Sequence, residues 1–143
     1  MKNFLQRCGP ALAWAILLFA LSSIPDLAFP VTVFSWDDKI HHAAAYTPLG
    51  FLLLQALVGK SAVGRRDLWL AILIGALYGV SDEIHQRFVP GRFMDWTDAA
   101  ADAAGVMFGS WIFYKWSAYR LARQQRANGK ADRKKIVSSR PWR

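Results

Sequence analysis

Four long apolar runs, separated by short polar stretches, dominate the chain. They cover residues 10–24, 38–58, 68–80 and 97–116. A helix that crosses a bilayer needs about 20 consecutive, mostly apolar residues. The third run is shorter, so we predict that its helix continues through residues 81–83 to reach that length. The pattern therefore predicts an all-α, polytopic membrane protein with about four transmembrane helices.

The first run follows Lys2 and Arg7, which is also the arrangement of a secretory signal peptide. No small-x-small cleavage site follows it and further hydrophobic segments do, so we expect an uncleaved first membrane helix. Pro48 lies inside the second run. Kinked helices are tolerated in bilayers when neighbouring groups satisfy the freed carbonyl, so we expect Pro48 to bend this helix without ending it.

The charges are segregated along the chain, which explains how a sequence that is 54% hydrophobic carries a net charge of +8. Basic residues dominate both termini and the loop 59–67, whereas every acid except Asp67 and Asp132 lies at the other ends of the runs. By the positive-inside tendency, both termini are expected in the cytoplasm. We therefore predict a multi-pass protein of the cytoplasmic membrane whose acid-rich end faces the extracytoplasmic side.

We expect one transmembrane domain over residues 1–118 and a basic cytoplasmic tail over residues 119–143. The tail should begin as a helix, become partly disordered, and contact anionic lipid headgroups. A pI near 10.1 is also typical of nucleic-acid-binding proteins, but the apolar runs favour membrane lipids over nucleic acid as the partner. Cys8 is the only cysteine, so the chain has no intramolecular disulfide. The sequence does not indicate an oligomeric state.

Ionisable side chains concentrate in residues 78–105, where the third and fourth runs meet at a short loop. Desolvating a charge inside a membrane costs several kcal/mol unless it is paired or exposed to water, so such residues are candidates for function. Residues three and four apart share one face of a helix. This spacing forms one stripe with Gly75, Gly79, Asp82, Glu83 and Gln86, and another with Asp98, Asp102, Gly105 and Gly109. We predict antiparallel neighbouring helices whose glycines meet in the inner half and whose acids meet in the outer half.

A third polar stripe opens the second run, where Asp38, His42 and Tyr46 follow one another at intervals of four residues. A carboxylate one turn before an imidazole fixes its tautomer and raises its basicity. The structural alternative is that Asp38 favours the helix N-terminus and His42 packs at the membrane interface. We expect the three stripes to line one polar pocket.

One interpretation of these residues is a phosphate site. Lys39, Arg87 and Arg92 supply positive charge at the acid-rich end. Arg92 is best placed, because the preceding Pro-Gly makes a tight turn and a guanidinium binds a phosphate bidentately. The alternative for Arg92 is a structural ion pair with Asp95 or Asp98.

Two other chemistries use the same region. His42 and the neighbouring carboxylates offer groups that suit a divalent cation. No signature spacing such as HExxH accompanies them, so we assign neither a metal nor another cofactor. Crowded carboxylates in a low-dielectric site also raise one pKa, which suits general acid–base catalysis by His42, Glu83 and Asp98.

Four motifs occur in order: LSSIPDLAFP after the first run, DKIHHAAAY opening the second, DEIHQRFVPGR closing the third and DWTDAAADAAGVMFG opening the fourth. Together they resemble the VanZ-like family of bacterial integral membrane proteins, over nearly the whole chain except the basic tail. The matching positions are Asp38, Lys39, His42, Tyr46, Glu83, Gln86, Gly91, Arg92, Asp98, Gly105 and Gly109. Where the family commonly has Asn, this chain has Asp102, which adds a potential charge.

The resemblance implies a small integral membrane protein of a family named after a member linked to teicoplanin resistance. Our leading hypothesis is a protein that binds an anionic, phosphate-bearing envelope lipid or lipid-linked cell-wall precursor and influences glycopeptide susceptibility. The rivals are a membrane-embedded enzyme with phosphoester or acyl-transfer chemistry, and a non-catalytic scaffold whose acids only pair with Lys39 and Arg92. The candidate catalytic residues are His42, Glu83 and Asp98. The candidate ligand-binding residues are Asp38, Lys39, Tyr46, Gln86, Arg92 and Asp102.

Overall fold

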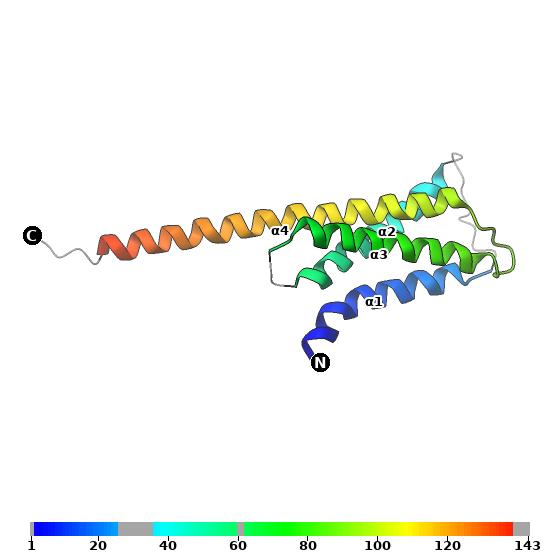
Figure 1. Ribbon diagram of the computed structural model, residues 1–143, viewed down its shortest axis with the longest axis horizontal. Helices are drawn as coiled ribbons and strands as arrows, with labels where there is room; N and C mark the ends of the chain where they lie inside the picture. Colours follow the sequence, from blue (N-terminus) through cyan, green and yellow to red (C-terminus); the bar gives the residue numbers. More distant parts are fainter. Residues whose placement is uncertain (1, 26–35, 60–61, 139–143) are drawn as a thin grey trace, which may run out of the picture.

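In a computed structural model of the chain, which describes residues 2–25, 36–59 and 62–138, these residues form four helices and no strand. The helices are α1 (Lys2–Ser22), α2 (Asp37–Val58), α3 (Arg65–Gln86) and α4 (Trp96–Ser138). They run in alternating directions, so α1 starts and α4 ends toward one end of the bundle, and the α3–α4 loop lies at the other end (Figure 1). The predicted all-α class is confirmed.

Local backbone chemistry sets the limits of α2. Pro48 lies inside this helix and does not end it, as expected. The helix stops before Gly59, whose φ of 60° is a left-handed conformation that glycine adopts without strain. A helix end leaves its last carbonyls without intrahelical partners. The Arg7 guanidinium donates hydrogen bonds to two of them, the carbonyl oxygens of Ala56 at 3.0 Å and Leu57 at 3.1 Å.

The third and fourth helices differ in how far they extend. As predicted, α3 continues through Asp82 and Glu83, and it ends at Gln86. In α4, the helix does not stop near residue 116 but continues unbroken to Ser138, well beyond the other three helices (Figure 1). The described part of the basic tail is therefore helical. The predicted disorder of the remaining tail, residues 139–143, falls outside the described residues.

Glycines bring α4 very close to α2. A Cβ added to Gly105 would overlap the backbone of Ala43, and a Cβ added to Gly109 would overlap the backbone of Thr47. Small residues at a helix interface allow two backbones to approach in this way. The α2–α4 contact therefore depends on the absence of side chains at these two positions.

The prediction that the α4 glycines meet the α3 glycines is wrong. Gly75 and Gly79 do face α4, but a Cβ at these positions would meet the side chains of Val106 and Asp102. The reason is that α4 packs against two helices at once. Its glycines approach the α2 backbone, and its larger side chains fill the space that the α3 glycines leave.

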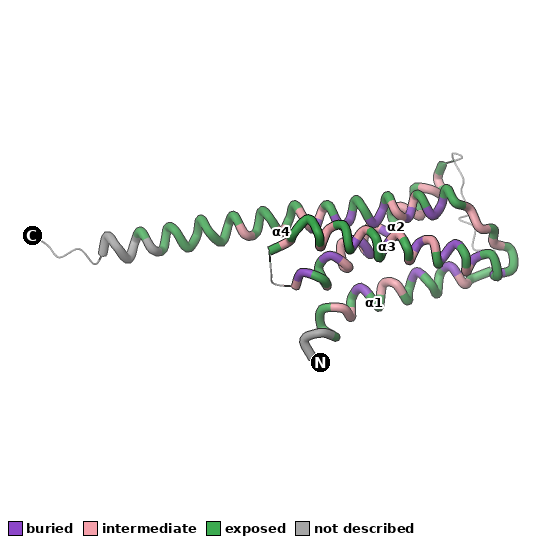
Figure 2. Tube along the Cα trace, in the orientation of Figure 1, coloured by how far each residue is buried: buried purple, intermediate pink, exposed green. Residues whose placement is uncertain are grey.

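Many large apolar side chains of the bundle are exposed. The buried residues lie where the helices face one another (Figure 2). Ile16 is 68% exposed and Trp69 is 63% exposed, for example. The segments Leu5–Ser22 and Arg65–Gln86 are long and apolar enough to cross a membrane. Extensive exposed apolar surface marks a contact with lipid or with another protein. These features are consistent with a membrane protein.

Candidate functional site

Polar and charged side chains gather at the end of the bundle that carries the α3–α4 loop. We call the following residues the polar cluster: Asp38, Lys39, His42 and Tyr46 of α2, Asp82, Glu83 and Gln86 of α3, Asp95 of the loop, and Asp98 and Asp102 of α4. Four of its carboxylates, those of Asp82, Glu83, Asp98 and Asp102, are buried. Buried charges need compensating partners, so the contacts within the cluster determine what it can do.

Lys39 joins α2 to the loop and to α4. Its Nζ donates hydrogen bonds to Asp95 Oδ2 at 3.0 Å and to Asp98 Oδ1, and it lies 3.7 Å from Asp38 Oδ2. The backbone N–H and the hydroxyl of Thr97 both donate to Asp95 at 2.8 Å, and together with Lys39 they lower the pKa of Asp95 to about 2. Three carboxylates thus surround one ammonium group, which leaves Lys39 little capacity to bind an external anion.

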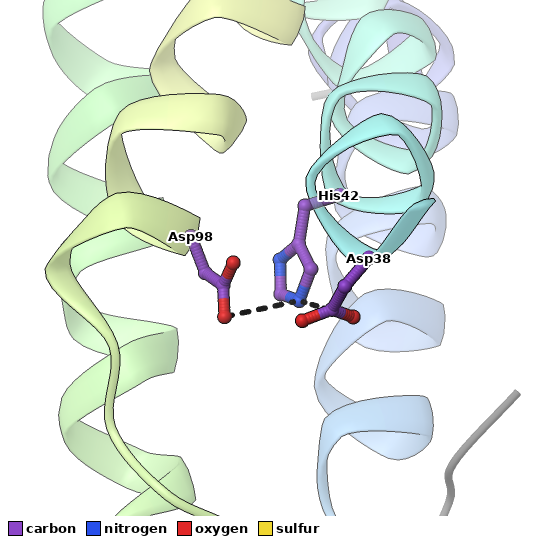
Figure 3. A group of neighbouring side chains, drawn as sticks. All are labelled: Asp38, His42 and Asp98. Carbon is purple, nitrogen blue, oxygen red and sulfur yellow. Dashed lines mark ion pairs between the residues drawn. The ribbon is translucent and has the colours of Figure 1, made fainter. Parts of the chain in front are cut away.

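His42 lies between two sets of carboxylates. Its Nδ1 is 3.0 Å from Oδ1 of Asp102, whose side chain is fully buried. Its Nε2 is 3.9 Å from Asp98 Oδ2 and 4.0 Å from Asp38 Oδ1, and both distances are too long for hydrogen bonds (Figure 3). An ionised Asp102 accepts a hydrogen bond from Nδ1, and this places the Nε2 lone pair toward Asp38 and Asp98. The predicted α2 stripe is therefore in contact with the α4 stripe.

Asp82 links α3 to α1 and α2. Its Oδ1 accepts a hydrogen bond from the Ser22 hydroxyl at 2.6 Å, and its Oδ2 accepts hydrogen bonds from the Tyr46 hydroxyl at 3.1 Å and from Gln86 Nε2 at 3.4 Å. All of these side chains are buried. Ser22 was not among the site residues predicted from the sequence, although two consecutive serines at the end of an apolar run are a signal of polar contacts there.

Glu83 anchors the α3–α4 loop. Its Oε2 accepts a hydrogen bond from the backbone N–H of Asp95 at 3.0 Å, and its Oε1 accepts one from Gln86 Nε2 at 3.2 Å. The residue is fully buried. Because both oxygens have donors and neither is reached by solvent, the geometry supports a structural role for Glu83. Its assignment as a catalytic acid or base stays a prediction.

Arg92 follows a tight turn in the α3–α4 loop. Gly91 has a φ of 76°, and the backbone N–H of Arg92 donates to the Val89 carbonyl oxygen at 3.1 Å. The Pro-Gly turn expected from the sequence is therefore present. The Arg92 side chain is half-buried in the same loop that supplies Asp95, so it lies on the loop side of the bundle. Its role in ligand binding stays a prediction.

Comparison with protein families identifies the chain. A family model described as VanZ/LLP1 matches residues 4–119. The chain belongs to the VanZ/LLP1 family. The matched region of this VanZ/LLP1 protein includes every residue of the polar cluster and leaves most of the basic end of α4 outside. No curated protein and no solved structure matches the chain.

Proposed function

We propose that this VanZ/LLP1 protein crosses the bacterial cytoplasmic membrane four times and binds a phosphate-bearing envelope lipid or lipid-linked cell-wall precursor. One observation carries the proposal: polar stripes of three helices converge at one end of a bundle whose outer surface is largely apolar. A bound lipid would extend its chains along the apolar surface and place its headgroup at the polar cluster. The binding site then faces the extracytoplasmic side.

The distribution of basic residues supports this orientation. Arg7 near the start of α1, and Arg65 and Arg66 at the start of α3, lie toward the end of the bundle from which the basic part of α4 projects (Figure 1). Basic residues favour the cytoplasmic side of a membrane. Both termini are then cytoplasmic, and the alternating helix directions supply four crossings. By length and composition, α1 and α3 contain the candidate membrane spans, whereas α2 and α4 begin with acidic residues at the cluster end.

The contacts of Lys39 indicate different roles for Lys39 and Arg92. Because Asp95 and Asp98 already bind the Lys39 ammonium group, this residue organises the carboxylates. Arg92 is the basic residue that we assign to the phosphate, since a guanidinium on a tight turn offers two parallel N–H donors to two phosphate oxygens. Retention of a lipid-linked precursor would change how much of it a glycopeptide can reach, which connects the site to teicoplanin susceptibility.

Lipid retention by the purified protein tests this proposal. We expect Arg92→Ala to reduce the phosphate lipid that co-purifies by about tenfold or more, because hydrogen bonds to a charged group contribute about 1.5–3 kcal/mol each. Arg65→Ala is the matched control, since it removes the same group at the opposite end of α3. Mass spectrometry of extracted lipids gives the readout. Equal retention by the wild type and both variants, at equal helical content, refutes the proposal and leaves the scaffold interpretation.

A second candidate function is phosphoester or acyl-transfer catalysis on a lipid. The contact of 3.0 Å between Asp102 and His42 favours it, because a buried carboxylate orients a general base in the same way in hydrolases. Turnover of a purified lipid-linked phosphoester distinguishes catalysis from binding. We expect His42→Gln to abolish such turnover, and His41→Gln, an exposed neighbour on the same helix, to leave it unchanged.

A further inference from the structure

The carboxylates around His42 carry more negative charge than Lys39 and His42 can neutralise. Four of them, Asp38, Asp95, Asp98 and Asp102, lie within 4.0 Å of the nitrogens of Lys39 or His42. Even with both nitrogens positively charged, the four carboxylates outnumber these two groups by two. The fully buried Oδ2 of Asp102 has no hydrogen-bond partner among the described residues. The cluster therefore has the electrostatic character of a cation site.

The Nε2 side of the His42 imidazole is the candidate position for a cation. One ligand atom each from Asp38, His42 and Asp98 lies within 4.8 Å of the other two. The His42 Nε2 is the ring nitrogen that faces both carboxylates (Figure 3). A charge-assisted hydrogen bond would draw a carboxylate to about 2.8 Å from Nε2, whereas the two distances here are 3.9 and 4.0 Å. The spacing leaves room for an ion between the three atoms.

The size of that space suits a divalent metal ion. With separations of 3.9 and 4.0 Å and a third of no more than 4.8 Å, the point equally far from the three atoms lies at most about 2.5 Å from each, against about 2.0–2.2 Å for zinc bound to nitrogen and carboxylate oxygen. A shift of a few tenths of an ångström closes the difference. The Asp38 side chain is 55% exposed and lies in the first turn of α2, so it has room to make this shift.

The surrounding groups already hold the three ligands in position. Metal-binding histidines characteristically donate their other ring N–H to a carboxylate, which is the contact that Asp102 makes with His42 Nδ1. Lys39 holds the opposite oxygen of Asp98 and lies 3.7 Å from the opposite oxygen of Asp38. The carboxylate oxygens that face Nε2 are thus the ones that Lys39 does not contact, and Nε2 is the ring nitrogen that Asp102 does not contact.

We infer that Asp38, His42 and Asp98 bind a divalent transition-metal ion, for which Zn²⁺ is the best match. Imidazole favours zinc over magnesium or calcium, and three protein ligands leave at least one coordination position open. A second grouping, of His42, Glu83 and Asp102, is less suited, because the oxygens of Glu83 are occupied by the loop and by Gln86. Asp102 is a positioning residue in this arrangement.

The metal site adds to the proposed function. It rests on that proposal only for the identity of the molecule that binds to the ion. Because Asp38 is exposed, the open coordination position is accessible from outside the bundle. A phosphate oxygen is a suitable fourth ligand there. Lys39 is already paired with three carboxylates, so the ion would supply the positive charge that attracts the phosphate. Arg92 would contact the same phosphate from the loop.

Zinc binding to the purified full-length chain, stripped with a chelator and freed of lipid in detergent, tests the inference. We expect one Zn²⁺ per chain by titration calorimetry and by elemental mass spectrometry. His42→Gln and Asp98→Asn should weaken the affinity by at least about tenfold, and so should the positioning variant Asp102→Asn. His41→Gln is the matched control, because it removes an exposed imidazole from the adjacent position of α2. If the variants of buried residues fail to fold, Asp38→Asn tests the same ion at an exposed ligand.

The outcomes separate this inference from the proposed function. Absence of stoichiometric zinc from the wild type, or equal affinities for His42→Gln and His41→Gln, overturns the metal site whatever the lipid result. Stoichiometric zinc lost in Asp38→Asn, together with unchanged lipid retention in Arg92→Ala, upholds the metal site and overturns the lipid proposal alone. Loss of lipid from the zinc-stripped wild type, restored by added ZnCl₂, supports both.

Discussion

Replacement of Gly105 by alanine tests whether the site depends on the close approach of α4 to α2. A Cβ at this position would lie 2.9 Å from the Ala43 carbonyl carbon and 3.0 Å from its Cα, and closer still to the carbonyl oxygen. Two carbons attract each other at about 3.5–4.0 Å, so the added methyl group overlaps α2 by at least about 0.5 Å. The obstructing atoms are backbone, and they cannot turn away as a side chain would.

The expected cost follows from two opposing effects. Overpacking a tight interior contact costs about 1–3 kcal/mol, and a rigid backbone neighbour places this case at about 3. Alanine in place of glycine within a helix recovers about 1 kcal/mol. The net loss is about 2 kcal/mol of unfolding free energy, or about a 30-fold change in the folding equilibrium. Separation of the helices would also lengthen the contact between His42 and Asp102, so zinc affinity should fall as well.

The assay is reversible denaturant unfolding in mixed micelles, followed by circular dichroism, with zinc titration of the folded variant. Gly129→Ala is the matched control, since it makes the same change in the same helix at a position with no neighbouring atom within 4 Å. We expect this control to be as stable as the wild type or more stable. Unfolding of Gly105→Ala at the same denaturant concentration as Gly129→Ala would refute the predicted overlap with α2.

Other contacts give further predictions. Tyr46→Phe removes a buried hydrogen bond of 3.1 Å to an acidic side chain and should cost about 2 kcal/mol in the same unfolding assay; an unchanged midpoint contradicts it. Arg7→Ala removes two hydrogen bonds to the end of α2 and should cost about 1 kcal/mol; hydrogen exchange faster only in the last turn of α2 would locate the effect. Thr97→Val removes one donor to Asp95, so its pKa should rise from about 2 toward the ordinary 3.8 in a carboxyl NMR titration. Because folding lowers the pKa of Asp95, its contribution to stability is complete above pH 3.8 and is lost as the pH falls toward 2. In Thr97→Val this pH range becomes narrower, because the folded pKa lies closer to 3.8.

The periodicity of polar and apolar residues predicted which residues share a face of each helix, because this depends only on neighbours within that helix. The spacing of three and four residues placed Asp82 and Gln86 on one face of α3 and Asp98 and Asp102 on one face of α4, and these faces are buried. The length that a membrane span needs predicted that α3 continues past residue 80. The tail was expected to begin as a helix, and α4 does continue to Ser138, because a basic, polar segment can continue a helix without an apolar face when the preceding turns already nucleate it.

The partners across helices could not be predicted in the same way, because they depend on how each helix is rotated against its neighbours. The glycines of α4 face the α2 backbone, although a pairing with the α3 glycines was equally compatible with the sequence. Lys39 was assigned to a phosphate, but its nearest groups are carboxylates of the loop and of α4. The metal ligands also lack a recognisable spacing, since Asp38 and Asp98 come from different helices. Ser22 was missed for the same reason.

The unbroken course of α4 gives the protein a mechanical connection between its two ends. At 1.5 Å per residue, its 43 residues form a rod about 65 Å long, with Asp98 in the first turn and the arginine-rich segment at the far end. An uninterrupted helix resists bending, so a tilt imposed on Asp98 by a ligand of the polar cluster would also move the far end of α4. In the four-span arrangement proposed above, ligand binding at the polar cluster would thus change the position of this basic segment on the opposite side of the membrane.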